Sequence, residues 1–182
     1  MPQKPEIIDR RQVASSRLFR IEELKLRFSN GVVRTYERLL GGMQPAVIII
    51  PVLNDDTVIL VREYGGGVDR YELALPKGRI ESGEDVLAGA NRELKEEVGY
   101  GAGKLELFKL MTQSPNYMQH RTQVVIARDL YTEYAEGDEP EPLEVVKVKL
   151  PDLEQWIMRE DLTEARTIAA LLMYKHIYFT AD

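Results

Sequence analysis

Apolar and polar residues alternate along the first part of the chain, which predicts β-structure there. Residues 17–40, RLFRIEELKLRFSNGVVRTYERLL, form two roughly alternating stretches joined at Asn30-Gly31, the dipeptide most typical of a short hairpin turn. Residues 46–53, AVIIIPVL, and 57–64, TVILVREY, predict two further strands around the turn NDD. Because the first of these two is apolar almost throughout, we expect both of its faces to be buried.

The pattern changes to a helical period in the middle of the chain, in GRIESGEDVLAGANRELKEEVGY at 78–100. Ser82 with Asp85 three residues later resembles a capping box, and Gly99 is suited to a left-handed cap, so we expect a helix between them. At about 100° per residue one side of this helix is apolar and must face the core. That stripe consists of Leu87, Ala90, Leu94 and Val98.

After this helix the sequence predicts more strands and then a helical C-terminus. Strands are expected in KLELFKLMT at 104–112, QVVIARDL at 123–130 and VVKVKL at 145–150, with an acid- and proline-rich loop at 131–144. Residues 152–158 and 163–179 carry apolar side chains at helical spacing. In the second of these helices the expected apolar residues include Ile168, Leu171, Leu172 and Ile177.

Composition narrows the chemistry that this chain can perform. With 182 residues, 44% hydrophobic and 30% charged, it is expected to fold as a globular enzyme or binding domain. It has no cysteine and two histidines, so a metal site would have to use oxygen ligands. The N-terminus has no apolar leader and no apolar run is long enough to span a bilayer, so we expect a cytoplasmic protein without a membrane partner. A net charge of −6 argues against nucleic-acid binding.

Three glutamates, Glu93, Glu96 and Glu97, lie within five positions of the central helix. On the same helical count Glu97 and Glu96 flank the apolar stripe instead of lying opposite it. An acidic helix face is most often simply solvated. Here, however, Glu93 and Glu97 are like charges at i,i+4 in a half-buried location, which is costly unless a cation neutralises them. Mg²⁺ suits such a cluster best, because it binds one or two carboxylates together with phosphate oxygens of a substrate.

The same segment resembles the Nudix box: Gly, five residues, Glu, seven residues, Arg-Glu, an aliphatic residue, any residue, Glu-Glu, any residue, Gly and an apolar residue. The matching positions are Gly78, Glu84, Arg92, Glu93, Leu94, Glu96, Glu97 and Gly99, with Tyr100 as an aromatic variant at the last one. The resemblance implies a hydrolase that uses Mg²⁺ or Mn²⁺ to cleave a nucleoside diphosphate linked to another group, X.

The implied fold is α/β, an α/β/α sandwich with a mixed β-sheet. Here it is preceded by an N-terminal β-hairpin extension. We expect residues 1–44 to form that extension and residues 45–182 to form the Nudix domain. By resemblance to the ADP-ribose branch of the family, the N-terminal strands are expected to pack across the two-fold axis of a homodimer.

The resemblance also assigns roles within the box. The implied metal ligands are Glu93, Glu96, Glu97 and the backbone carbonyl of Lys77. Arg92 is expected to hold the glutamates in geometry. In the ADP-ribose branch the general base is a glutamate on the loop before a late strand, which points to Glu139 first and Glu141 second. Glu96 is the alternative, because clustered carboxylates raise one pKa.

Signals of the substrate are mixed. Pro115, sixteen residues after Gly99, resembles the ADP-ribose pyrophosphatases, whereas Tyr117 and LPKG at 75–78 resemble the diadenosine polyphosphate hydrolases. Strings along the whole chain, such as SRLF, FSNGV and EGDEPEPL, resemble the branch that acts on ADP compounds in general. The implied reaction is hydrolysis of ADP linked to X, including ADP-ribose, NADH and diadenosine di- and triphosphates, to AMP and X-phosphate.

One position departs from the ADP-ribose branch: Gly65 stands where those enzymes often have an arginine, and Arg62 or Arg70 is expected to compensate. The candidate substrate-binding residues are Arg62, Arg70, Glu72, Pro115 and Tyr117.

Three alternatives stay open at this point. Two are narrower enzymes, an ADP-ribose pyrophosphatase and a nucleotide-sugar diphosphatase acting on GDP-mannose. The third is a non-catalytic nucleotide-binding module, which predicts a loss of box glutamates that this sequence does not show.

Overall fold

The computed structural model of the chain describes residues 2–41 and 45–179. These residues divide into two compact units. The first contains residues 2–41 together with 112–121, and the second contains the other described residues. Each unit is described below by itself.

The first unit is a three-stranded antiparallel sheet in the order β1-β2-β3, formed by β1 (Glu6–Ser15), β2 (Arg20–Arg27) and β3 (Val33–Leu39). The expected hairpin is confirmed, with Gly31 in its turn at φ 81°. Strand β1 was not predicted, because its side chains are almost all exposed and its sequence shows no regular alternation. Loop 112–121 joins this sheet: the Leu39 N–H donates to the Tyr117 carbonyl at 2.8 Å.

The second unit is built around a mixed sheet in the order β10-β5-β4-β9-β8, with β6 paired to β5 and β7 paired to β4. Strand β4 runs parallel to β9 and antiparallel to β5 and β7. The strands are β4 (Ala46–Asn54), β5 (Thr57–Gly65), β6 (Arg70–Ala74), β7 (Lys77–Arg79), β8 (Tyr100–Thr112), β9 (Arg121–Thr132) and β10 (Glu144–Lys149). Strand β4 is buried from Val47 to Val52, as its apolar sequence predicts.

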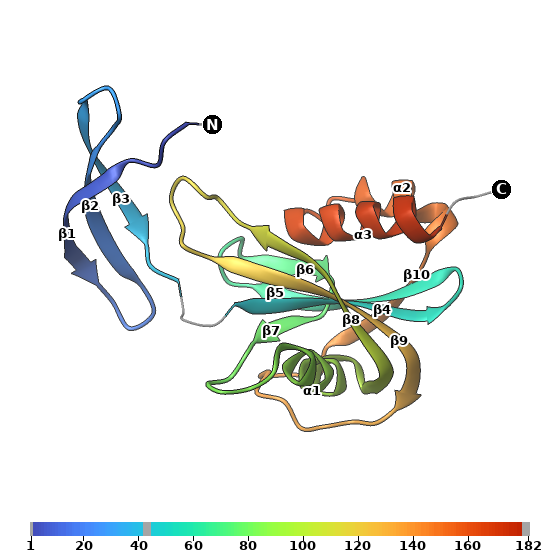
Figure 1. Cartoon of the computed structure of the whole chain (residues 1–182). Helices are drawn as coiled ribbons and strands as arrows, with labels where there is room; N and C mark the ends of the chain where they lie inside the picture. Colours follow the sequence, from blue (N-terminus) through green and yellow to red (C-terminus); the bar gives the residue numbers. More distant parts are fainter. Residues whose placement is uncertain (1, 42–44, 180–182) are drawn as a thin grey trace. The chain divides into compact units, whose positions relative to one another are not determined.

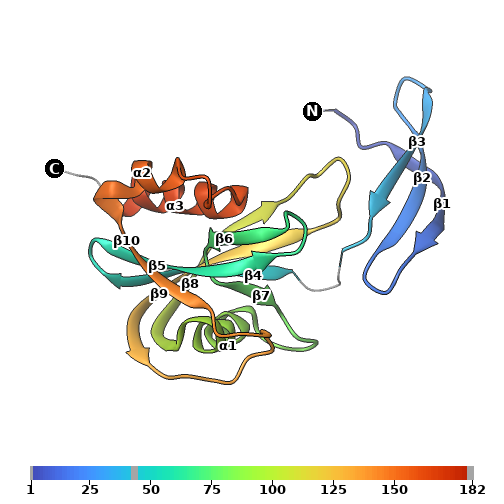
Figure 2. The same cartoon turned by 180° about the vertical axis from the view of Figure 1, so that it is seen from behind.

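Helices cover both faces of this sheet (Figures 1 and 2). Helix α1 (Val86–Val98) lies on one face, and α2 (Leu153–Ile157), which follows the 3₁₀ turn η1 (Leu150–Asp152), lies with α3 (Ala165–Tyr178) on the other. Because β4 alternates, its Val47 and Ile49 belong to the core under α1, and Ile48 and Ile50 to the core under α3. The predicted α/β/α sandwich with a mixed sheet is therefore confirmed.

Helix α1 begins later than the sequence suggested. Asp85, not Ser82, is the N-cap, and its carboxylate accepts hydrogen bonds from the N–H groups of Leu87 and Ala88 at 2.9 and 3.2 Å. Ser82 is too far from the first helical turn to cap it, because it lies in the turn that precedes Asp85. The other end is as expected, with Gly99 in the left-handed conformation at φ 77°.

Two of the apolar residues expected in this C-terminal helix, α3, lie on its outer side. Leu172 and Ile177 are exposed, whereas Leu171 is fully buried and Ile168 packs against the core. At about 100° per residue Leu172 turns away from the contact that Leu171 makes, so one stripe alone reaches the sheet. Within the described ranges no helix is long and apolar enough to cross a membrane.

Candidate active site

Two carboxylates of α1 are buried at the border between the helix and the sheet. Glu93 and Glu97 are each only 7% exposed, deeper than the half-buried location that the helical register predicts. Glu93 packs directly onto Gly78 in β7, where an added Cβ would lie 1.9 Å from the Glu93 Cδ. The Glu97 Oε2 accepts a 3.0 Å hydrogen bond from the Lys77 N–H. The backbone at Lys77 and Gly78 therefore packs directly against the two buried glutamates of the helix.

A single guanidinium links the acids of the box. Arg92 donates through Nε to Glu84 at 3.0 Å, and through Nη1 to both Glu93 and Glu96 at 3.0 Å. Its Nη2 donates to the Arg79 carbonyl at 2.9 Å. These contacts, first of all the hydrogen bond with Glu84, raise the pKa of Arg92. Arg92 therefore fixes three carboxylates and the end of β7 in one arrangement.

Burial leaves the two deepest carboxylates with perturbed titration. It raises the pKa of Glu97 to about 8, with the nearby charges of Glu63 and Glu93 adding to the effect and Lys77 opposing it. Burial likewise raises the pKa of Glu93 to about 7, although Arg92 opposes the shift. Both carboxyls therefore keep their protons to a higher pH than usual in the metal-free fold, and a divalent cation bound to these hard oxygen donors would stabilise their charged form.

Glu93, Glu96 and Glu97 line an acidic cavity of about 880 Å³. Five more acids line it: Glu63, Glu81, Glu136, Asp138 and Glu139. Over residues 2–41 and 45–179 no three acidic or histidine side chains already stand in the arrangement of a metal site. Oxygens of Glu93 and Glu96 instead accept from Arg92. The donor set fits a divalent ion in its chemistry and its burial.

The acidic loop before β10 distinguishes the two candidate bases. Glu139 lines the acidic cavity, and its charge contributes to the raised pKa of Glu93. Glu141 accepts a hydrogen bond from the Tyr71 hydroxyl and does not line that cavity. The loop is attached to α1 by the ion pair between Lys95 and Glu133 at 2.8 Å. Both acids line a smaller cavity of about 350 Å³ with Glu96 and Glu97, and of the two Glu139 alone also lines the acidic cavity with Glu93.

Arg62, Arg70 and Glu72 are not brought to the acidic cavity. Arg62 pairs with Glu144 at 2.7 Å and with Asp161 at 2.9 Å. Arg70 donates to Glu72, which accepts in turn from the Thr163 N–H and hydroxyl. These contacts tie β5 and β6 to the segment before α3. A substrate contact of Arg62, Arg70 and Glu72 stays a prediction.

The alternation of side chains along β5 explains why Glu63, and not Arg62, lines the acidic cavity. In β5, Val61 belongs to the core under α1 and Leu60 to the core under α3. Arg62 therefore shares the face of Leu60, and Glu63 shares the face of Val61, toward the box. Glu63 lines the acidic cavity and pairs with the Lys77 ammonium. The alternation of side chains along TVILVREY predicts that Arg62 and Glu63 lie on opposite faces of the strand. It does not tell which of the two faces packs against α1.

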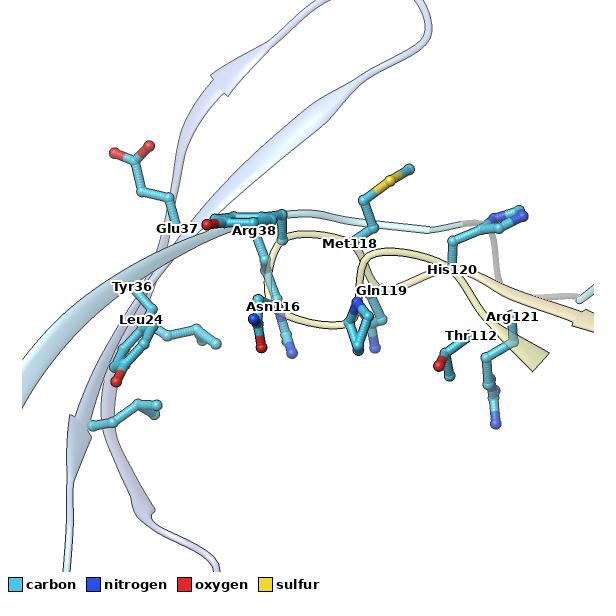
Figure 3. A pocket seen from close by; sticks show the side chains of 13 residues that line it. Leu24, Tyr36, Glu37, Arg38, Thr112, Asn116, Met118, Gln119, His120 and Arg121 are labelled. Carbon is cyan, nitrogen blue, oxygen red and sulfur yellow. The ribbon is translucent and has the colours of Figure 1, made fainter. Parts of the chain in front are cut away.

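Pro115 and Tyr117 lie in the first unit, in a second cavity of about 720 Å³. Its other lining residues include Leu24 of β2 and Tyr36 and Arg38 of β3. Figure 3 shows Leu24, Tyr36 and Asn116 directed to one side of strand β3, with Glu37 and Met118 directed to the other. This cavity combines aromatic and polar side chains, a lining typical of small-molecule sites.

Comparisons with known proteins agree with this geometry. The NUDIX domain profile matches residues 42–172, and the profile described as the NudE-type Nudix hydrolase N-terminal domain matches residues 5–38. The chain therefore belongs to the Nudix hydrolase family, which confirms the enzyme class expected from the box.

Individual relatives place it more closely within that family. The chain is 46% identical over 173 residues to the ADP compounds hydrolase NudE of Escherichia coli (strain K12), covering 95% of this chain and 92% of that protein. It is 31% identical over 128 residues to the ADP-ribose pyrophosphatase of Bacillus subtilis (strain 168), covering 69% of each. A solved structure titled "Crystal structure of ADP compounds hydrolase" matches with a TM-score of 0.90 and 45% identity, covering 97% of this chain and 95% of that one.

The burial of Glu97 predicts that removing its charge raises the stability of the metal-free protein and lowers its activity. A carboxyl whose folded pKa lies above its unfolded value destabilises the metal-free fold as pH rises from the unfolded value toward the folded one, about 8. Glu97→Gln should therefore raise the unfolding temperature in EDTA at about pH 8 by several degrees, and by less at about pH 5. Turnover with Mg²⁺ should fall at least about 100-fold.

Thermal unfolding in EDTA and a steady-state assay check both parts of this prediction. Glu154→Gln is the matched control, because Glu154 is an exposed acid paired with Lys175 outside the acidic cavity. Near-native turnover of Glu97→Gln, or a lower unfolding temperature at both pH values, would contradict it.

Proposed function

We propose that this chain hydrolyses the diphosphate bond of ADP linked to X, giving AMP and X-phosphate. One observation carries the proposal: the buried Glu93 and Glu97 carboxylates face an acidic cavity in a chain that is similar over nearly its whole length to a protein named ADP compounds hydrolase. The X groups that we expect are ribose in ADP-ribose, dihydronicotinamide riboside in NADH, adenosine in diadenosine diphosphate and AMP in diadenosine triphosphate.

The carboxylates of Glu93, Glu96 and Glu97, with the backbone carbonyl of Lys77, are the groups that would hold Mg²⁺ or Mn²⁺. When bound, such ions neutralise charge on the phosphates and lower the pKa of the attacking water. Arg92 holds Glu93 and Glu96 through hydrogen bonds of 3.0 Å, so its part is to keep these ligands oriented.

A residue of this chain must accept the proton that the attacking water loses. The oxygen of a water forms a bond to one phosphorus, and the bond from that phosphorus to the bridging oxygen breaks with its electron pair leaving on the departing phosphate. We assign the acceptance of that water's proton to Glu139, because it lines the cavity together with the box glutamates. Glu96, which is held by Arg92, is less available for this role.

A narrower activity is the second candidate. The 31% identity to an ADP-ribose pyrophosphatase favours hydrolysis restricted to ADP-ribose. Pro115 and Tyr117 bear on this choice as candidate contacts for the substrate, because they line a cavity with Tyr36 and Tyr117 is 69% exposed. An exposed aromatic ring is suited to stacking on a base.

A panel of substrates tests the proposed function. Purified protein with Mg²⁺ should release AMP from ADP-ribose, NADH and diadenosine triphosphate, because recognition of the ADP part leaves the X group variable. Chromatography of the products gives the result, and GDP-mannose serves as the comparison substrate without ADP. Release of AMP from ADP-ribose alone would support the narrower activity, whereas hydrolysis of none of the four would contradict both.

The position of Glu139 predicts a difference between two neighbouring acids. Glu139→Gln should lower kcat at least about 100-fold and remove the acidic limb of the pH–rate profile, because a general base must be deprotonated. Glu141→Gln is the matched variant on the same loop and should stay within about fivefold of the unaltered enzyme. A large loss for Glu141→Gln with a small one for Glu139→Gln would reverse the assignment.

The first unit supports a proposal of a homodimer. Among its described residues Leu24 is the one buried hydrophobic side chain. Several large apolar side chains of its sheet and turns are exposed: Ile7, Val13, Leu18, Phe19, Val32 and Tyr36. A three-stranded sheet with so little buried surface needs a cover to be stable, and a second copy of the chain supplies one.

Light scattering during size exclusion tests this association. The mass should be twice the chain mass of 20.8 kDa, and Val13→Asp should lower it toward the monomer by placing a charge on the exposed sheet. Met158→Asp, at an exposed apolar residue of the second unit, is the control and should leave the mass unchanged. A monomer mass for the unaltered chain at micromolar concentration would contradict the proposal.

A further inference from the structure

A lysine and a glutamate form an ion pair in the wall of the acidic cavity. The Lys77 ammonium contacts the Glu63 carboxylate, and both side chains line the cavity. The backbone beneath Lys77 is fixed, because its N–H donates to Glu97 at 3.0 Å and the next residue, Gly78, packs against Glu93. The lysine side chain therefore starts from a rigid point within the candidate metal site.

The cations of this cavity differ in how firmly they are held. Arg92 donates through all three of its nitrogens to Glu84, Glu93, Glu96 and the Arg79 carbonyl, so it cannot turn to a substrate without releasing the box. The Lys77 ammonium has three N–H groups, and Glu63 is the side chain that accepts from it among the described residues. Lys77 keeps the capacity to donate to further acceptors.

We propose that the Lys77 ammonium binds a non-bridging oxygen of the substrate diphosphate, and that Glu63 positions this ammonium before the substrate arrives. The inference rests on the proposed function, because it concerns the diphosphate that the enzyme cleaves. A diphosphate must enter a cavity lined by eight carboxylates, so a positive group that can reach it lowers the cost of entry. Lysine suits this task as a compact charge on a flexible stem.

Glu63 has a distinct part in this arrangement. Lys77 lies close enough to Glu97 for its charge to act on that carboxylate. Without a competing partner the ammonium would be drawn to Glu97, where it would oppose cation binding. Glu63 holds the ammonium away from the box glutamates and within the same cavity. It is therefore a positioning residue, whereas Lys77 contacts the substrate.

Replacing the charge of Lys77 tests the contact directly. Lys77→Met should lower kcat/KM at least about 100-fold, and Lys77→Arg should recover activity to within about tenfold of the unaltered enzyme. Lys175→Met is the matched control, because Lys175 is similarly buried and paired with Glu154 on the helices of the opposite face. It should stay within about twofold. A Lys77→Met variant within about threefold of the unaltered enzyme would overturn the proposal.

Glu63→Gln separates substrate binding from simple support of the fold. If Lys77 contacts the phosphate, Glu63→Gln should lose less than about tenfold in kcat/KM, far less than Lys77→Met, while both variants unfold at similar temperatures. If the ion pair between Lys77 and Glu63 served only to connect β5 and β7, the two variants would lose similar amounts of stability and of activity. Equal losses of kcat/KM would therefore overturn the proposal.

A binding measurement keeps this inference separate from the proposed function. If the unaltered chain cleaves no ADP compound, the proposed function is wrong, and Lys77 is then tested with inorganic pyrophosphate and Mg²⁺ by calorimetry. A Kd at least about tenfold weaker for Lys77→Met than for the unaltered chain and Lys175→Met would support the contact. An unchanged Kd, or no binding of pyrophosphate by the unaltered chain, would overturn it.

Discussion

The burial of two like-charged carboxylates on one helix is the constraint on which the rest of the site depends. Glu93 and Glu97 are one turn apart and almost wholly buried, a location that costs free energy unless other groups compensate. The chain compensates in part, with Arg92 beside Glu93 and with the Lys77 N–H and charge beside Glu97. The rest of the free-energy cost of burying these carboxylates would be offset by a bound cation, so cation binding is expected to stabilise the fold.

The architecture makes this burial possible. Strand β4 supplies one core to α1 and another to α3 through alternate residues, so that α1 is pressed onto the sheet along its full apolar stripe. Gly78 in β7 leaves room for the Glu93 carboxylate where any side chain would displace it. The loop before β10 then brings Glu139 to the same cavity. Residues of α1, of β7 and of the loop before β10 thus meet at one cavity.

The sequence alone was sufficient for the features with a strong period or a fixed spacing. The hairpin at Asn30-Gly31, the buried strand at 46–53 and the helix ending at Gly99 all follow from residue pattern, and the box residues follow from their spacing. The short strands β6 and β7 did not, because five and three residues are too few to show alternation. Asp85 as the N-cap was missed because two polar residues compete for that role within one turn.

Side-chain roles were harder to predict than elements, since they depend on which way a strand or loop faces. Arg62 and Glu63 are adjacent in the chain and lie on opposite faces of β5, so Glu63, which the sequence did not single out, lines the acidic cavity. Glu139 and Glu141 are two residues apart, yet Glu139 lines the acidic cavity whereas Glu141 accepts a hydrogen bond from Tyr71 outside it. Such choices are set by tertiary packing, which local patterns do not record.

Direct titration of Mn²⁺ onto the metal-free protein, followed by electron paramagnetic resonance, tests the central claim that these buried carboxylates hold a divalent ion. The account predicts that the unaltered chain and Glu154→Gln bind Mn²⁺ alike, and that Glu97→Gln binds it at least about tenfold more weakly. Equal binding by Glu97→Gln would contradict the account, because the charge buried at α1 would then have no part in holding the ion.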